Sequence, residues 1–306
     1  SDLINDYETH QIARGRTKVS NVLSVIRRGM RPFLDRDVRS LTAAELVEVI
    51  DKIAAKGHAG AANDFRARCR AFLSWCRDSK KVLAANPLME HRRERPTRVQ
   101  KLQREEPGRA LNNDEIQAVW AATEKSAVYS RLIRFVLLTG CRRTEASMVS
   151  RSMMETEDGG HRSLVIPKAI TKSGRDHRLA VTPQLAGLLA RCPQDALSDL
   201  FFPSSRTGGP IKGWSKLHAS FVSDCGVKFG LHDLRRTLKT GLDALGVDSD
   251  ISERCLNHTR QGLEGIYNKN NATEEVSAAF HLWAEFVAAG TVNPAQASGA
   301  ASEVAV

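Results

Sequence analysis

The chain has 306 residues, of which 42% are hydrophobic and 26% charged, a composition typical of a globular protein with room for two domains. No apolar run approaches the roughly 18 residues of a membrane span, and the N-terminus lacks the apolar core of a signal peptide, so we expect a cytoplasmic protein with no membrane partner. Lysine and arginine number 45 against 35 aspartate and glutamate, and the formal charge of +10 favours a polyanionic partner, with nucleic acid as the leading candidate. The six cysteines form no CxxC pair, which indicates neither a zinc site nor a disulfide framework. We expect them to be reduced and buried.

The first ninety residues carry the pattern of a small helical unit. Apolar residues at helical spacing predict one amphipathic helix over residues 2–29, and a capping box at Thr42 and Glu45 predicts a second helix that stops at Gly57. A third helix is predicted over residues 60–78, where arginines alternate with an apolar stripe. Such arginines are typical of a solvated face, but as a group they also fit contacts to phosphate groups.

A basic segment follows. Residues 91–109 hold seven lysines or arginines against three glutamates, with two prolines and almost nothing apolar. A segment of this kind cannot bury a core, so we predict a semi-extended linker over residues 91–110 that lets the domains on either side close around a duplex. The alternative is a spacer without contacts. The candidate DNA-binding residues of the helical unit and the linker are Arg66, Arg70, Arg92, Arg93 and Lys101.

A second domain is predicted over residues 111–290, where helices are interrupted by two strands. Its predicted helices begin at the capping-box pair Asn112 and Glu115 and cover residues 127–139, 184–190 and 274–289, and its strands cover 163–167 and 179–181. The last helix could cap its own domain or dock on a neighbouring protomer. Residues 204–213 form a glycine-rich loop without the spacing of a P-loop, and residues 291–306 are small and polar, which predicts a disordered tail.

Charged side chains lie beside the predicted turns of this domain. The helix over 127–139 should end at Gly140, which places Arg142 just after a helix terminus. Glu145, three residues later on the same face, can hold the arginine by a charge-assisted hydrogen bond, although a plain surface salt bridge is the alternative. Lys172 lies in the turn between the two strands, where it can reach a neighbouring site.

The stretch from residue 231 onward concentrates groups that can hold a phosphate. His232 and Arg235 are three residues apart and share one helical face. His258 follows within the next turns of chain, in Leu-Asn-His, and Tyr267 comes nine residues after it. The sequence therefore predicts a phosphate-binding cluster that needs further positive charge from elsewhere in the chain.

Taken in order, these pieces resemble the catalytic signature of the tyrosine recombinases, the phage-integrase family. The matching fragments are TGxRxxE (Thr139 to Glu145), a lysine in a β-turn (Lys172), HxxR (His232 to Arg235), Leu-x-His (Leu256 to His258) and the tyrosine Tyr267. Each fragment is weak alone, but five in this order make coincidence improbable. The resemblance implies a mainly α fold with a small β-sheet: a helical core-binding domain (residues 1–90), the linker, and an α+β catalytic domain (residues 111–290).

The resemblance also implies roles for the residues that match. Tyr267 would attack a DNA phosphate to give a 3′-phosphotyrosyl bond, and Arg142 and Arg235 would clamp that phosphate, since guanidinium groups bind phosphate oxygens bidentately. Glu145 would support the arginine. A phenol with a pKa near 10 is a poor nucleophile, and a positive cluster makes its anion easier to form.

The remaining roles concern protons. Lys172 would protonate the leaving 5′ oxygen, His232 would be a hydrogen-bond and proton partner, and His258 would donate a further bond to the phosphate. Because the covalent intermediate retains the energy of the phosphodiester, neither a cofactor nor a metal is expected. One departure is Asn257, where the family has glycine; asparagine is the residue other than glycine that best tolerates a left-handed backbone, so we expect the turn to survive.

The implied activity is site-specific DNA recombination through a Holliday junction, by a homotetramer on two double-stranded attachment sites of a phage or mobile element. DNA-bending or excision-directing accessory proteins are expected partners, and the protein is expected to be associated with the nucleoid. Many family members carry a further arm-binding domain; since the chain starts at Ser1 without a methionine, we expect that such a segment was removed. Two alternatives stay open: a type IB topoisomerase that relaxes DNA, and a non-catalytic DNA-binding regulator with the same fold.

Overall fold

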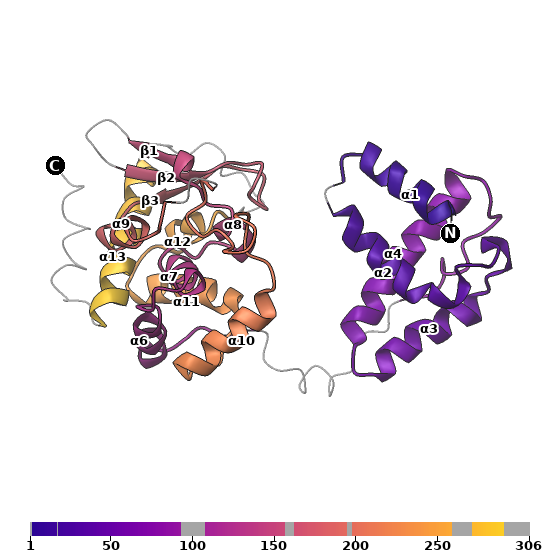
Figure 1. Cartoon of the computed structure of the whole chain (residues 1–306), viewed down its shortest axis with the longest axis horizontal. Coiled ribbons are helices and arrows are strands. Elements are labelled where there is room, and N and C mark those ends of the chain that lie inside the picture. Colours follow the sequence, from indigo (N-terminus) through magenta and orange to yellow (C-terminus); the bar gives the residue numbers. More distant parts are fainter. Residues whose placement is uncertain are drawn as a thin grey trace. The chain divides into compact units, whose positions relative to one another are not determined.

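The computed structural model describes residues 2–16, 18–92, 108–156, 162–194, 198–258 and 271–290. The chain divides into two compact units, residues 1–103 and 104–306, and the division lies within the basic segment. The predicted fold class is confirmed, because the described residues are mainly helical and contain a three-stranded sheet (Figure 1). Within these ranges, no helix is long and apolar enough to cross a membrane.

The N-terminal unit consists of helices around α4. Its elements are α1 (Asp2–Ala13), α2 (Val19–Gly29), the 3₁₀ turns η1 (Arg31–Phe33) and η2 (Val38–Ser40), α3 (Ala43–Ala55) and α4 (Ala59–Asp78). Helix α4 contacts α1, α2 and α3, and its stripe of Phe65, Cys69, Phe72, Leu73 and Cys76 is buried as the spacing predicted. Thr42 and Glu45 form the predicted capping box at the start of α3, with each side chain accepting a hydrogen bond from the other residue's backbone N–H.

The prediction of one helix over residues 2–29 was wrong. The chain breaks between α1 and α2, where Gly15 has a φ of 69° and its N–H donates to the carbonyl of Ile12. Glycine commonly ends a helix in this left-handed conformation. Ile12, one of the apolar residues at helical spacing, is 60% exposed at this break. The apolar spacing continues across Gly15, so the spacing alone gave no sign that the helix breaks there.

The C-terminal unit holds the sheet and the remaining helices. The helices are α6 (Asn113–Ala122), α7 (Val128–Thr139), α8 (Arg143–Ala146), α9 (Pro183–Ala190), α10 (Trp214–Cys225), α11 (Leu231–Ala244), α12 (Ser249–Cys255) and α13 (Asn271–Ala289), and the 3₁₀ turn is η3 (Arg151–Met153). The strands are β1 (Met154–Thr156), β2 (Arg162–Ile166) and β3 (His177–Ala180), all antiparallel in the order β1-β2-β3. In Figure 1 the sheet lies at the top of this unit and α6 and α10 lie farthest from it.

The core of this unit forms around α7, which is buried along almost its whole length. Helix α11 packs against α7, and both predicted strands register with each other so that Leu164 faces Leu179 with both side chains fully buried. All six cysteines are free; five are buried as expected, and Cys225 is partly exposed.

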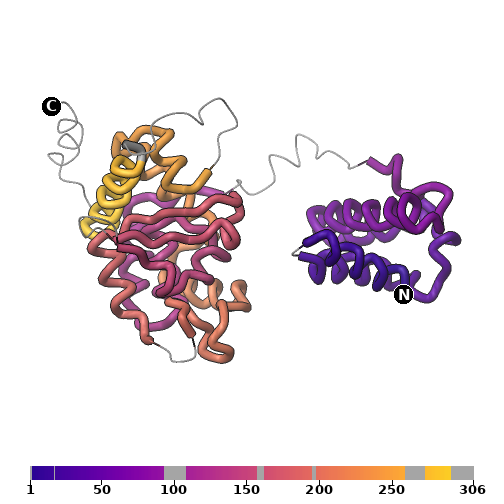
Figure 2. The backbone as a smooth tube through the Cα atoms, turned by 90° about the horizontal axis from the view of Figure 1, so that it is seen from above, coloured from indigo at the N-terminus to yellow at the C-terminus, as the bar shows by residue number. Residues whose placement is uncertain are grey.

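Helix α13 covers its own unit, the first of the two positions that the sequence left open. Its Trp283 is fully buried and donates from Nε1 to the carbonyl of Leu137 on α7, at 2.8 Å. The indole also lies against Gly241 of α11, where an added Cβ would come 2.2 Å from a ring carbon. Figure 2 shows α13, in yellow, on the outside of the unit.

Candidate active site

Arg142 is presented by the junction of two helices. Helix α7 ends at Gly140, whose φ of 62° favours glycine, and an added Cβ there would be 2.7 Å from a terminal methyl group of Leu256. Two residues later Arg142 takes an extended conformation as the residue that precedes α8. The turn predicted from Thr139-Gly140 is therefore present, and it directs the chain so that the Arg142 side chain is only 21% exposed.

Glu145 is the centre of a hydrogen-bond network rather than half of a surface salt bridge. It is 1% exposed, and its Oε1 accepts from the Arg142 guanidinium at 3.0 Å and from the backbone N–H of Lys172 at 2.9 Å. Its Oε2 also accepts from the backbone N–H of Arg142. Burial alone would raise the pKa of Glu145, but the Lys172 N–H and the Arg142 charge hold it below its ordinary value. The carboxylate stays charged and joins two segments 27 residues apart.

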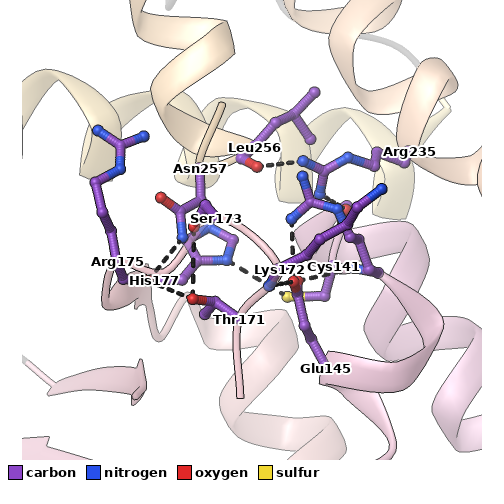
Figure 3. Close-up of polar contacts among 12 residues, drawn as sticks. Cys141, Glu145, Thr171, Lys172, Ser173, Arg175, His177, Arg235, Leu256 and Asn257 are labelled. Atoms are coloured by element: carbon purple, nitrogen blue, oxygen red, sulfur yellow. Dashed lines mark hydrogen bonds and ion pairs between the residues drawn. The ribbon is translucent and has the colours of Figure 1, made fainter. Parts of the chain in front are cut away.

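Arg235 lies on α11 with 2% exposure, and its guanidinium reaches two backbone carbonyls. One terminal nitrogen donates to the carbonyl of Gly140 at 2.6 Å, and the other donates to the carbonyl of Leu256 (Figure 3). Its Nε is buried and has no partner among the described residues. Burial and the neighbouring Arg142 lower the pKa of Arg235 to about 10, so the group remains charged at neutral pH. The site therefore contains a buried cation with an unused donor.

Lys172 lies on the loop between β2 and β3, as the sequence predicted. Its backbone is held by Glu145, whereas its side chain is exposed. Figure 3 shows the Lys172 loop passing beside Glu145 and Arg235. A lysine with a fixed backbone and an exposed side chain can reach a ligand in this region.

The two histidines lie within the electrostatic field of the arginines. Partial burial is the main reason that the pKa of His232 is lowered, and the charges of Arg236, Arg235 and Arg142 lower it further. Burial likewise lowers the pKa of His258, with Arg235 and Arg142 adding to the effect. Both rings are therefore mainly neutral near pH 7.

A carboxylate that we did not predict orients one of these rings. Glu253, on α12, is hydrogen-bonded through Oε2 to Nδ1 of His258. The bond favours a proton on Nδ1, so that Nε2 carries the lone pair in the neutral ring. The sequence does carry a signal, since an acid five residues before His258 lies about one and a half helical turns upstream, but that spacing is too common to indicate a contact.

The tyrosine that the motif singled out, Tyr267, lies outside the described residues. The other two tyrosines of the sequence are both buried, Tyr7 in the N-terminal core and Tyr129 against Trp214 and Phe221. Burial raises the pKa of both phenols, and the Tyr129 hydroxyl is bonded to His218. Neither is suited to attack a polymer.

The residues predicted to contact DNA in the helical unit and the linker differ from one another in the groups that they contact. Arg66 donates to the carbonyl of His91 at 2.9 Å and so ties the end of this unit to α4, and Arg70 contacts the sulfur of Met89. Arg92 is exposed. Arg93 and Lys101 lie outside the described residues, as do residues 291–306.

Beneath the arginines lie two buried groups that the sequence did not single out. His177 on β3 is 2% exposed; its Nε2 is bonded to the carbonyl of Cys255 at 2.9 Å, and its Nδ1 is 4.0 Å from Sγ of Cys141. Burial lowers the pKa of His177 to about 4 and raises that of the Cys141 thiol to about 12. Both groups are neutral, so they support the charged site without adding charge. The described residues contain no group of three or more His, Cys, Asp or Glu side chains arranged to hold a metal ion.

Solved structures with the same architecture have been determined on DNA. A lambda integrase fragment, as a dimer bound to a COC′ core site, superposes with a TM-score of 0.64 at 17% sequence identity, covering 87% of this chain and 98% of that chain. Lambda integrase as a tetramer bound to a Holliday junction gives 0.64 and 17%, with 87% and 79% covered. The XerH recombinase bound to a palindromic difH substrate gives 0.54 and 16%, with 88% and 77% covered. Neither a protein-family profile nor a curated protein sequence matches the chain. The chain therefore has the tyrosine recombinase fold over most of its length.

Proposed function

We propose that this chain is a tyrosine site-specific recombinase, which cleaves and rejoins double-stranded DNA through a 3′-phosphotyrosyl intermediate and a Holliday junction. The observation that carries the proposal is the pair formed by Arg142 and Arg235 around the buried Glu145, with the Nε of Arg235 unused and buried. A buried cation with an unsatisfied donor is costly unless a ligand pairs with it. A phosphate diester offers the matching acceptors and charge.

Arg142 and Arg235 carry more positive charge than the Glu145 carboxylate can neutralise, so the site favours binding of an anion. Glu145 offsets one of the two arginine charges, and its oxygens are already occupied by Arg142 and by the backbone of Lys172. Among the described residues, the hydrogen bonds of the Arg235 guanidinium go to backbone carbonyls. Of Arg142, Arg235 and Glu145 together, one net positive charge therefore remains to stabilise the negative charge that develops on the non-bridging phosphate oxygens during transfer.

The proposed step exchanges one phosphodiester for another. The Tyr267 oxygen forms a bond to phosphorus while the bond from phosphorus to the 5′ oxygen breaks. The departing oxygen takes a proton from Lys172, and the phenolic proton passes to His232, whose lowered pKa keeps its ring neutral and able to accept it. In its protonated form, which the charges of Glu253 and of a bound phosphate favour, His258 donates from Nε2 to the phosphate while Nδ1 is bonded to Glu253. Attack by a 5′-hydroxyl of another strand reverses the step and completes the exchange.

The partners follow from the reaction. Two double-stranded attachment sites of a phage or mobile element would be bridged by four copies of the chain, with DNA-bending or excision-directing proteins as accessory factors, and the protein would associate with the nucleoid. The solved neighbours support this assembly only by analogy, since one is a tetramer on a Holliday junction. Contacts from Arg66, Arg70, Arg92, Arg93 and Lys101 to DNA phosphates remain part of the proposal.

Covalent capture tests the proposal directly. The chain is incubated with nicked suicide duplexes built on the repeats that flank its gene, and protein-linked DNA is separated on a denaturing gel. We expect capture by the wild type and none by Tyr267→Phe, which should still bind DNA with an affinity that falls steeply with salt. Tyr129→Phe is the matched control and should retain capture, because that hydroxyl contacts only His218 among the described residues.

Plasmid relaxation and native gels, run beside the capture assay, separate the alternatives. A type IB topoisomerase would relax supercoiled plasmid of any sequence, whereas a recombinase needs paired sites. A DNA-binding regulator would shift the duplex in a native gel and leave no covalent product. Equal capture by the wild type and Tyr267→Phe would refute the assignment of the nucleophile.

A further inference from the structure

The loop that carries Lys172, residues 167–176, is closed by its own hydrogen bonds. The backbone N–H of Lys168 donates to the Asp176 carboxylate at 2.6 Å, and the hydroxyl of Thr171 donates to the carbonyl of Arg175 at 2.6 Å. Gly174, at a φ of 70°, makes the turn. These bonds connect the two sides of the loop, so a contact that holds Arg175 also restrains Lys172.

The turn that carries His258 is shaped by Asn257. Helix α12 ends in a Schellman motif, in which the His258 N–H donates to the carbonyl of Glu253 at 3.1 Å and the Asn257 N–H to that of Arg254 at 2.8 Å. Asn257 occupies the left-handed position of this motif, with a φ of 50°. The backbone expected for glycine is thus kept, and the side chain is an addition to it.

That side chain joins the two segments. The Asn257 Nδ2 donates to the carbonyl of Arg175 at 3.2 Å, and the Arg175 guanidinium donates back to the carbonyl of His258 at 2.8 Å. The two bonds run in opposite directions between residues 82 and 83 positions apart. Figure 3 shows Asn257 and Arg175 beside each other, with Thr171 and Ser173 of the loop close by. Asn257 is 7% exposed, so water competes little for its amide.

We propose that Asn257 and Arg175 are positioning residues that latch the Lys172 loop to the His258 turn. The loop is then fixed at two points: at Lys172 by Glu145, and at Arg175 by Asn257. With glycine at position 257 the turn would form and the bond from Arg175 to the His258 carbonyl would remain, but the bond from the side chain at 257 to the Arg175 carbonyl would be lost. This inference rests on the proposed function, because it assigns the latch to the group proposed to protonate the leaving oxygen.

Hydrogen exchange measures the latch without any catalysis. In the free full-length chain, Asn257→Gly keeps the left-handed turn and removes only the side-chain bond, so amides of residues 168–176 should exchange about 2- to 10-fold faster, as expected for one lost hydrogen bond. Arg175→Ala should have a similar effect. Arg178→Ala is the control, because Arg178 is an exposed arginine of the same hairpin that contacts Glu155 instead. Unchanged exchange in both Asn257→Gly and Arg175→Ala would overturn the latch.

A modified substrate shows whether the latch acts through Lys172. A thiolate leaves without needing a proton, so a duplex with sulfur in place of the bridging 5′ oxygen removes the need for a general acid. On the ordinary duplex we expect Asn257→Gly to lower the single-turnover cleavage rate about 2- to 10-fold with DNA affinity unchanged. On the sulfur duplex the variant should cleave as fast as the wild type.

The outcomes distinguish the latch from the proposed function. A loss of rate on both duplexes would mean that Asn257 only supports the fold near the site, which overturns the positioning role. If the wild type cleaves neither duplex, the proposed function fails, while faster exchange in Asn257→Gly would still establish the contact. If Lys172→Ala loses rate equally on both duplexes, the lysine's proposed role is wrong, and the link from latch to leaving group falls with it.

Discussion

Acid should destabilise the C-terminal unit through His177, because its buried ring must stay neutral in the fold. The ring is 2% exposed and is bonded to the carbonyl of Cys255. Burial is the main effect that opposes its protonation, and the nearby charges of Arg235 and Arg142 oppose it further. The pKa of His177 is lowered from 6.5 to about 4. The unfolded chain therefore takes up a proton at a pH where the folded chain does not.

The sign and size follow from that difference. The contribution of His177 is fully present above pH 6.5 and is lost as the pH falls from 6.5 towards 4, since only the unfolded state is protonated in that window. About 2.5 pH units at about 1.4 kcal/mol each correspond to about 3.5 kcal/mol in the free energy of unfolding, of which about 3 kcal/mol is lost by pH 4, where the folded ring is half protonated. For a unit of this size that is a large share of the total.

The measurement is urea unfolding at a series of pH values between 7 and 4. In a Trp75→Phe background the remaining tryptophans, Trp120, Trp214 and Trp283, all report on the C-terminal unit. The comparison is His177→Gln, whose amide can still donate to the Cys255 carbonyl but does not titrate. Relative to that variant, the chain with His177 should lose about 3 kcal/mol more on acidification. Parallel pH profiles for the two proteins would show that the histidine is not held neutral, and the reasoning would fail.

Two further substitutions test the network and the packing around the site. Glu145→Gln should lower the free energy of unfolding by about 1–3 kcal/mol, because the partly buried Arg142 loses its charged acceptor, and chemical denaturation should show it. Gly241→Ala should destabilise by about 1–3 kcal/mol through overpacking against Trp283, with reduced thermal stability as the measurement. Gly187→Ala is its control, since an added Cβ there meets nothing within 4 Å and should be neutral or stabilising. Equal effects of the two glycine substitutions would contradict the packing of α13.

Several helix ends and turns were predictable because their signals are local. The capping boxes at Thr42 and Asn112 and the left-handed residue at Gly140 each depend on residues within a few positions of one another, and all are present. The same holds for Asn257, where only the backbone tolerance of asparagine had to be judged. Local chemistry decides such features, so a sequence reports them.

Strand β1 and helix α10 were not predicted, because their sequences lack a clear hydrophobic period. Strand β1 has three residues, which is too short for an alternation to be visible, and α10 has a largely exposed face with one buried residue, Phe221. The break at Gly15 was hidden by an apolar spacing that continued across it. In each case packing in three dimensions decides the structure, and the linear pattern carries little of that information.

The contacts of the site were beyond prediction for a related reason. That Glu145 bonds the backbone of Lys172, and that Arg175 meets the turn of His258, depends on a hairpin and a helix end meeting across 27 and 83 residues. The motif named most of the charged side chains without indicating which backbone groups hold them. Glu253 and His177 were overlooked because neither belongs to the motif.

Arg235 contributes both to the proposed site and to the fold, because its side chain is held by backbone carbonyls. Arg235 is proposed to bind the phosphate, yet in the free protein it also holds the end of α7 through Gly140 and the end of α12 through Leu256. These carbonyls are dipoles rather than charges, so they position the guanidinium without neutralising it, and its charge remains available to an anion. A carboxylate in their place would orient the arginine equally well but would cancel the field that the phosphate needs. Within the part of the chain that the structure describes, Glu145 is therefore the carboxylate bonded to Arg142, and neutral groups hold Arg235.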